Sequence, residues 1–120
     1  VKYIKKITKP VIKQIHIKET NDFSEILSDV EMYFSVSKHI ILDCYSKYSK
    51  GGTGEKFNWE KYKSIIEMDD IFVAGGLNPN NIGNLMENFS PWGLDVSSGV
   101  ETNGEKNALK ITEFIKIVNS

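Results

Sequence analysis

The hydrophobic positions of the chain follow two alternating periods from the first residues to the last. Four short runs are rich in β-branched residues and leucine, which predicts strands. These runs are residues 11–17, 39–42, 71–74 and 94–97. The clearest helical pattern follows a candidate cap at Asn21 or Asp22. Its apolar face consists of Phe23, Ile26, Leu27, Val30 and Phe34.

Helical spacing returns after each of the later strands. It predicts helices around residues 59–66, 82–89 and 107–118. Strand and helix therefore alternate four times at spacings of roughly thirty residues, the length of a βαβ unit. Such alternation requires parallel strands with helices on their faces. We expect one α/β domain over residues 1–120, either an open doubly wound sheet or part of a (β/α)8 barrel. Residues 1–7 are expected to end an earlier helix, with Ile4 and Ile7 facing inward.

The amino-acid composition excludes several kinds of binding partner. Of 120 residues, 40% are apolar and 26% charged, which is typical of an ordinary soluble domain. The net charge is −1 and the lysines are spread along the chain, which predicts neither nucleic-acid nor membrane binding. There is no arginine, so an anion site must use lysine, backbone amides or a residue from elsewhere. No apolar run reaches the ~20 residues of a membrane span and there is no signal-peptide pattern, so a cytoplasmic location is expected.

Two aspartates lie at the ends of predicted strands, where parallel α/β folds gather their functional residues. Asp43 ends the apolar run "HIILD" and is a candidate general acid or base, because a carboxyl group there is partly desolvated. Alternatively, it accepts backbone hydrogen bonds from the next loop. In "LDVSSG", strand alternation would turn Asp95 and Ser97 to the same side, which we expect to be the side of the site.

Glycines follow three of the predicted strands. Gly75 and Gly76 form either a tight turn or a phosphate-binding turn made of backbone amides, and Ser98 with Gly99 on the neighbouring strand favours the second hypothesis. Asn78 is a candidate helix cap, with Pro79 at the first helical position. The loop "KGGTG" contains Gly52, Thr53 and Gly54. It lacks the complete P-loop pattern and is interpreted either as a phosphate-binding loop or as a lid.

The remaining reactive side chains point to structural roles. Cys44 is the only cysteine and is expected to be a passive, buried thiol, since Asp43 beside it would raise its pKa. His16 and His39 have no further ligands at metal-binding spacing, so no metal site is expected. Trp59 and Trp92 are most simply core residues.

Four segments together resemble the phosphoribosylanthranilate isomerase family. They are "LD" at residues 42–43, "GGTGEKFNW" at 51–59, "AGGLNPNNI" at 74–82 and "LDVSSGVETNGEKN" at 94–107. Their order and spacing agree with the family over essentially the whole chain, but only with the second half of its barrel. The resemblance implies that the four strands are strands five to eight of a (β/α)8 barrel.

The resemblance also implies a reaction and the residues that perform it. The reaction is the Amadori rearrangement of N-(5-phosphoribosyl)anthranilate to 1-(2-carboxyphenylamino)-1-deoxyribulose 5-phosphate in tryptophan biosynthesis, without a cofactor. Asp43 would be the general acid that protonates the furanose ring oxygen. The implied substrate-binding residues are Asp95, Gly52, Thr53 and Gly54, and the implied phosphate-binding residues are Gly75, Gly76, Ser98 and Gly99.

Two parts of the family's site are absent from this chain. They are the cysteine of a Lys-Ile-Cys-Gly segment, which acts as general base, and an arginine for the anthranilate carboxylate. Cys44 is a poor substitute, because it follows Asp43 and would point to the opposite side of the strand. The resemblance therefore implies a chain that binds the phosphosugar substrate without meaningful turnover by itself.

Half a barrel leaves two sheet edges and an inner face uncovered. We therefore expect the chain to pair with the missing N-terminal half or with a second copy, or to be a fragment of a longer polypeptide. The competing hypothesis is a non-catalytic phosphosugar-binding or assembly module derived from such a barrel. Another phosphate-binding barrel enzyme would require the motif matches to be accidental.

Overall fold

The computed structural model describes residues 1–18, 20–44 and 57–120. Within them, four parallel strands form one sheet in the order β1-β2-β3-β4. The strands are β1 (Ile12–His16), β2 (His39–Asp43), β3 (Ile71–Ala74) and β4 (Gly93–Leu94). The parallel α/β arrangement predicted from the sequence is thus confirmed. Each strand lies beside the strand that precedes it in the sequence.

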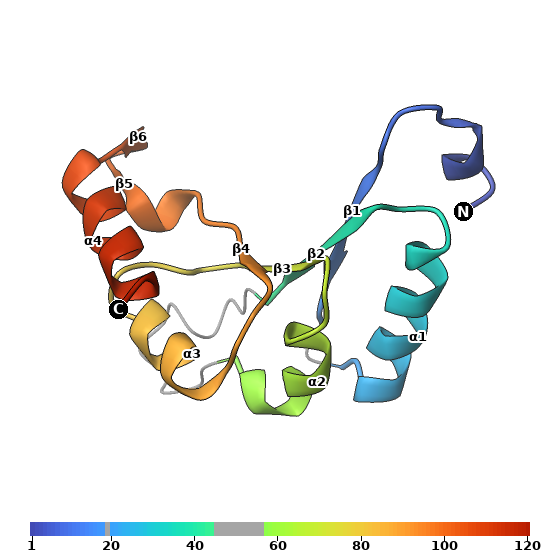
Figure 1. Cartoon of the computed structure of the whole chain (residues 1–120), viewed down its shortest axis with the longest axis horizontal. Helices are drawn as coiled ribbons and strands as arrows, with labels where there is room; N and C mark the ends of the chain where they lie inside the picture. The colour runs from blue at the N-terminus through green and yellow to red at the C-terminus, as the bar shows by residue number, and fades with distance from the viewer. Residues whose placement is uncertain (19, 45–56) are drawn as a thin grey trace.

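Helices follow each strand as the periodicity predicts. They are α1 (Phe23–Phe34), the 3₁₀ helix η3 (Trp59–Tyr62) leading into α2 (Lys63–Ile66), α3 (Ile82–Asn88) and α4 (Ala108–Val118). In Figure 1, α1, α2 and α3 lie along the same side of the sheet, and α4 lies beside α3. Short elements complete the described chain: η1 (Ile4–Lys6), η4 (Ser98–Val100), β5 (Glu101–Thr102) and β6 (Glu105–Lys106).

Capping side chains explain where the two longest helices begin. The Asp22 carboxylate accepts a hydrogen bond from the backbone N–H of Glu25 at 2.9 Å, and the Asn107 side chain accepts one from Lys110 at 3.0 Å. Both satisfy amides that have no partner within the helix. The hydrogen bond from Glu25, with a second from the Ser24 hydroxyl, holds the pKa of Asp22 below its usual value. The predicted start of α1 is therefore confirmed.

The hydrophobic core lies between the sheet and the helices. The register places Ile15 beside Leu42 and Leu42 beside Val73, so these side chains project from the same face. That face packs against apolar residues of α1, α2 and α3. The fully buried members of this core include Val30, Ile40, Leu42, Ile65, Ile66, Ile71, Val73, Ile82 and Leu85.

The opposite face of the sheet is much less covered. Ile12, Ile41 and Phe72 project from it, and Ile12 is 57% exposed while the other two are half-buried. Within the described residues, β1 and β4 each pair with a single neighbouring strand. Parallel sheets normally have both faces buried, so this face is less covered than is usual for a parallel sheet.

Two predictions about local structure need correction, and one element was not predicted. Residues 1–7 form only the short η1, which has no buried residue, and Ile7 is 53% exposed. The fourth strand ends at Leu94 instead of Ser97: the Asp95 N–H still bonds to the Val73 carbonyl, but the chain then turns into η4. A hairpin of β5 and β6 was not predicted, although its turn at Asn103 and Gly104, both with positive φ, is a recognisable signal.

A glycine in α3 provides a test of the helix itself. A Cβ atom at Gly83 would meet only Ile117 Cγ2, at 3.8 Å, which is an ordinary contact. Gly83→Ala is expected to raise the free energy of unfolding by about 0.5 kcal/mol, since alanine loses less backbone entropy in a helix. Chemical denaturation checks this. As the matched control, Gly93→Ala is expected to destabilise, because its Cβ would lie 2.6 Å from the Phe72 ring.

Candidate functional site

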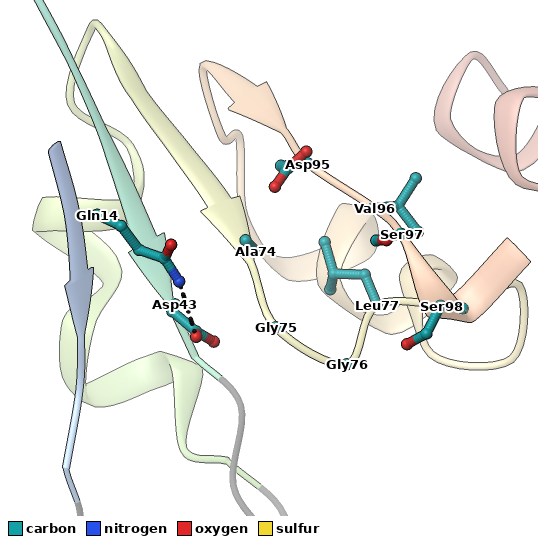
Figure 2. Close-up of a pocket in the computed structure, with 11 residues that line it drawn as sticks. Gln14, Asp43, Ala74, Gly75, Gly76, Leu77, Asp95, Val96, Ser97 and Ser98 are labelled. Carbon is teal, nitrogen blue, oxygen red and sulfur yellow. Dashed lines mark hydrogen bonds between the residues drawn. The ribbon is translucent and has the colours of Figure 1, made fainter. Parts of the chain in front are cut away.

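A pocket of about 260 Å³ opens at the carboxyl ends of the strands. It is lined by Gln14, Asp43, Ala74, Gly75, Gly76, Leu77, Asp95, Val96, Ser97, Ser98 and Gly99. Figure 2 shows these residues arranged around one space, coming from β1, from β2 and from the segments after β3 and β4. Six of the residues predicted from the sequence therefore lie together here: Asp43, Asp95, Gly75, Gly76, Ser98 and Gly99.

Asp43 ends β2 on the open face of the sheet, and its side chain is 20% exposed. Two side chains of β1 approach the same carboxylate oxygen. Gln14 Nε2 donates a hydrogen bond to Asp43 Oδ2 at 3.1 Å (Figure 2), and His16 Nδ1 lies 3.4 Å from that oxygen. The strand register explains this approach, because His16 is the direct neighbour of Asp43 and Gln14 lies two residues earlier on the same face.

The turn after β3 requires its two glycines. Gly75 has a φ of 97° and Gly76 a φ of 70°, in the left-handed region that favours glycine. This confirms the tight turn; it leaves the phosphate-binding hypothesis as a prediction. Asn81 supports the turn, since its Nδ2 donates to the Gly76 carbonyl at 2.7 Å.

Asn78 does not occupy the cap position predicted for it. The residue that immediately precedes α3 is Asn81, and Pro79 lies in the turn before the helix. Asn78 Oδ1 nevertheless accepts hydrogen bonds from the backbone N–H groups of Asn80 and Asn81, at 2.8 and 3.0 Å. It therefore caps this preceding turn, because the regular helix begins at Ile82, as the helical spacing predicts, and not at Pro79.

Gly99 lies where two loops of the pocket meet backbone to backbone. A Cβ atom at this position would lie 1.7 Å from the carbonyl oxygen of Leu77, a distance that no side chain tolerates. The segment after β4 can therefore approach the segment after β3 only with glycine at residue 99. This contact brings the two glycine-bearing turns to one side of the pocket.

Lysines anchor the loop that carries Ser98 and Gly99. Lys106 Nζ donates to the Ser97 carbonyl at 3.1 Å and also pairs with the Glu101 carboxylate. Lys110 Nζ donates to the Glu101 carbonyl at 2.7 Å. Neither lysine was predicted from the sequence to support the site, because only the β5–β6 hairpin and α4 bring the lysines close to their partners.

Cys44 has the passive role predicted for it. Its side chain is 2% exposed and belongs to the core between sheet and helices, on the side of the sheet away from the pocket. Burial, and secondarily the negative charge of Asp43, raises the pKa of the thiol well above its ordinary value of 9.0. A protonated, buried thiol is neither a nucleophile nor a base.

The Cys44 thiol is expected to make stability depend on pH. It stays protonated in the folded chain while it ionises in the unfolded chain, so the stability it contributes is complete below about pH 8.5 and declines as the pH rises further. Cys44→Ala should therefore flatten the loss of stability between pH 8 and 10, as measured by urea denaturation. In addition, the folded chain should resist a thiol reagent at pH 8 that labels the unfolded chain; rapid labelling of the folded chain would contradict this assignment.

Other predicted residues lie away from the pocket or outside the described structure. Gly52, Thr53 and Gly54 fall in the segment that is not described. Trp59 is half-buried against Phe89, as expected of a core residue, but Trp92 is 46% exposed and stacks on His39 at the opposite ends of the strands. Among the described residues, no group of three or more metal-ligating side chains occurs, and none of the described helices is long and apolar enough to cross a membrane.

Comparison with known proteins gives one consistent family. The family described as "N-(5'phosphoribosyl)anthranilate (PRA) isomerase" matches residues 1–117. The N-(5'-phosphoribosyl)anthranilate isomerase of Dehalococcoides mccartyi is 37% identical over 119 residues, which are 97% of this chain and 54% of that protein. The chain thus spans about half the length of the curated relatives it matches.

Solved structures agree. The phosphoribosyl anthranilate isomerase of Thermococcus kodakaraensis superposes with a TM-score of 0.71 at 29% identity, covering 92% of this chain and 53% of that one. A second isomerase structure, solved in complex with reduced 1-(o-carboxyphenylamino)-1-deoxyribulose 5-phosphate, gives a TM-score of 0.61 at 26% identity and covers 92% of this chain and 48% of that one. The four-stranded parallel sheet therefore has the architecture of this barrel-forming family.

Proposed function

Because the chain belongs to the N-(5'-phosphoribosyl)anthranilate isomerase family, we propose that it supplies the acid-bearing and phosphate-binding part of such an isomerase. The observation that carries this proposal is the convergence of Asp43, Asp95 and two glycine-bearing turns on one pocket. The Asp43 carboxyl group lies at one side of this pocket. The turn at Gly75 and Gly76 and the segment at Ser98 lie elsewhere around it (Figure 2).

The half-barrel part of the proposal assigns β1 to β4 as strands five to eight of a (β/α)8 barrel, in a single carboxyl-terminal half-barrel domain. Three observations support it. The chain matches about half the length of its relatives. The sheet is open at β1 and β4 within the described residues, and its less covered face carries Ile12, Ile41 and Phe72. A closed barrel would bury that face and join both edges.

The remaining part of the barrel is the partner that this face requires. We assign this role to the segment of the family's fold that the chain does not match, because it would supply both strand partners and a facing layer of side chains. Alternating apolar residues near the amino ends of the strands and polar residues near the carboxyl ends would then become the interior and the active site of the barrel.

The chemistry assigned to the pocket is an acid-catalysed ring opening. Asp43 gives its proton to the furanose ring oxygen of N-(5-phosphoribosyl)anthranilate while the bond from that oxygen to C1 breaks and the anilino nitrogen forms a Schiff base at C1. A base then removes the C2 proton, which converts the Schiff base to the enolamine of the product. Cys44 cannot serve as this base, because it faces the core, so we assign the base to the family's cysteine, which belongs to the unmatched segment.

The phosphate is assigned to the turn at Gly75 and Gly76 and to the loop with Ser98 and Gly99. Backbone N–H groups serve this purpose in a chain that has no arginine. The two carboxylates occupy the other part of the pocket, where they would repel a phosphate. The ligand is therefore expected to bind with its phosphate at the glycine turns and its ring toward Asp43.

Ligand binding to the 120-residue chain tests the phosphate assignment directly. Reduced 1-(o-carboxyphenylamino)-1-deoxyribulose 5-phosphate, titrated into the chain in a calorimeter, is expected to bind, and removal of its phosphate group should weaken binding at least about tenfold. Equal affinity for both ligands would contradict the phosphate site. The alternative, a module that binds phosphosugars without any role in isomerisation, predicts the same binding but no activity after the chain is joined to the unmatched segment of a relative.

A further inference from the structure

The carboxylate of Asp43 is held by two side chains of the neighbouring strand. Gln14 Nε2 and His16 Nδ1 lie 3.1 and 3.4 Å from the same oxygen, Oδ2. Both residues stand on β1, two positions apart, and therefore on the same open face of the sheet as Asp43. Neither residue was predicted from the sequence to belong to the site. His16 was assessed only as a metal ligand, and Gln14 has no feature in the sequence pattern that indicates a function.

These contacts restrict how the Asp43 carboxyl group is oriented. Oδ2 accepts the hydrogen bond of Gln14 Nε2, and His16 Nδ1 lies 3.4 Å from the same oxygen. Rotation of the carboxyl group would break the hydrogen bond and remove the contact. When the carboxyl group is ionised, the hydrogen bond from Gln14 becomes charge-assisted and therefore stronger.

The contacts of Gln14 and His16 with Asp43 contribute little to the stability of the fold. Gln14 is exposed, and the His16 side chain is 49% exposed, so neither contributes to the hydrophobic core. Hydrogen bonds between exposed side chains contribute little to folding, since water replaces them at small cost. Gln14 also lines the pocket beside Asp43 (Figure 2).

We infer that Gln14 and His16 are positioning residues, which fix the rotamer of the Asp43 carboxyl group in the pocket. This inference rests on the proposed function, because it assigns a purpose to the orientation of a general acid. It adds two residues of β1 to a site that the sequence analysis built from the ends of the next three strands.

The test uses a joined enzyme, in which this chain is fused to the segment of the Dehalococcoides mccartyi relative that it does not match. Gln14→Leu and His16→Leu each remove one polar contact with Asp43 at similar size. Each is expected to lower kcat about tenfold, with KM changed less than twofold, because a misdirected acid affects the chemical step and not binding. His16→Asn is the rescue variant, since the asparagine amide places a polar group where Nδ1 lies; it should retain at least a third of the original kcat.

A spectroscopic measurement accompanies the kinetics and does not depend on activity. In the ¹³C-labelled 120-residue chain, the Asp43 carboxyl resonance should move in Gln14→Leu and His16→Leu, while the unfolding midpoint stays the same. Full kcat in both leucine variants of an active joined enzyme, or an unmoved resonance, overturns the positioning inference alone. An inactive parent enzyme overturns the proposed function, and the catalytic purpose of the two residues fails with it.

Discussion

Asp43→Asn is expected to reduce kcat of the joined enzyme by about 10³-fold while it leaves binding of the phosphorylated product analogue within a factor of about three. Asparagine has the same shape and keeps an oxygen that can accept the Gln14 hydrogen bond, but it has no proton to donate to the ring oxygen. Activity is followed by the loss of substrate fluorescence, and binding by calorimetry.

A matched variant at the other end of the sheet controls for the loss of one negative charge. Asp70 contacts His39, with 3.2 Å between Oδ1 and Nδ1, and has a φ of 66°, which asparagine also tolerates. Asp70→Asn is expected to retain at least half of the activity. If Asp43→Asn and Asp70→Asn were equally active, Asp43 would not be the general acid.

Gly99→Ala is expected to produce the largest loss of stability. Its Cβ would lie 1.7 Å from the Leu77 carbonyl oxygen, so the loops after β3 and β4 must move apart. Overpacking of this kind costs about 3 kcal/mol, and the separated loops should no longer bind the phosphate of the ligand. Thermal unfolding of the 120-residue chain measures the first effect and calorimetry measures the second.

Gly104 offers the control for this glycine. Its φ is 82°, but nothing lies within 4 Å of a Cβ at this position. Gly104→Ala should therefore show only the cost of a left-handed alanine, about 1 kcal/mol, with ligand affinity unchanged. A Gly99→Ala variant as stable as Gly104→Ala, with undiminished affinity, would show that the close approach of the two loops is unnecessary.

The parallel sheet was predictable because its strands and helices differ in period and alternate regularly. Ile40, Leu42, Ile71 and Val73 lie in short runs of β-branched residues and leucine, and each run is followed by apolar residues at helical spacing. The ends of β2 and β3 could be predicted from single residues, since Asp43 is a charged residue after an apolar run and Gly75 is the first glycine after the next run, with a positive φ.

Less was predictable where structure depends on distant partners. The fourth strand was extended to Ser97 because its pattern continues, but the pairing that maintains β4 ends at Leu94, and the Leu77 carbonyl occupies the space beside Gly99. Trp92 is a large aromatic residue, which predicts a position in the core, but it stacks on His39 at the ends of the strands opposite the pocket.

The site itself was predicted one strand end at a time, and this explains what was missed. Asp43, Asp95 and the glycines stand directly after strands, where position alone indicates function. Gln14 lies inside β1, and its contact with Asp43 depends on the register between β1 and β2. That register is a property of two segments together, which the periodicity of neither segment reveals.

The most direct test of the account is the isomerisation of freshly made N-(5-phosphoribosyl)anthranilate by three samples: the 120-residue chain, the unmatched segment of the Dehalococcoides mccartyi relative, and the two mixed at equal concentration. We expect no turnover by either piece alone and measurable turnover by the mixture, which disappears with Asp43→Asn. Efficient turnover by the chain alone would contradict the assignment of the base to the other segment. A mixture that binds the product analogue but never turns over would contradict the isomerase function itself.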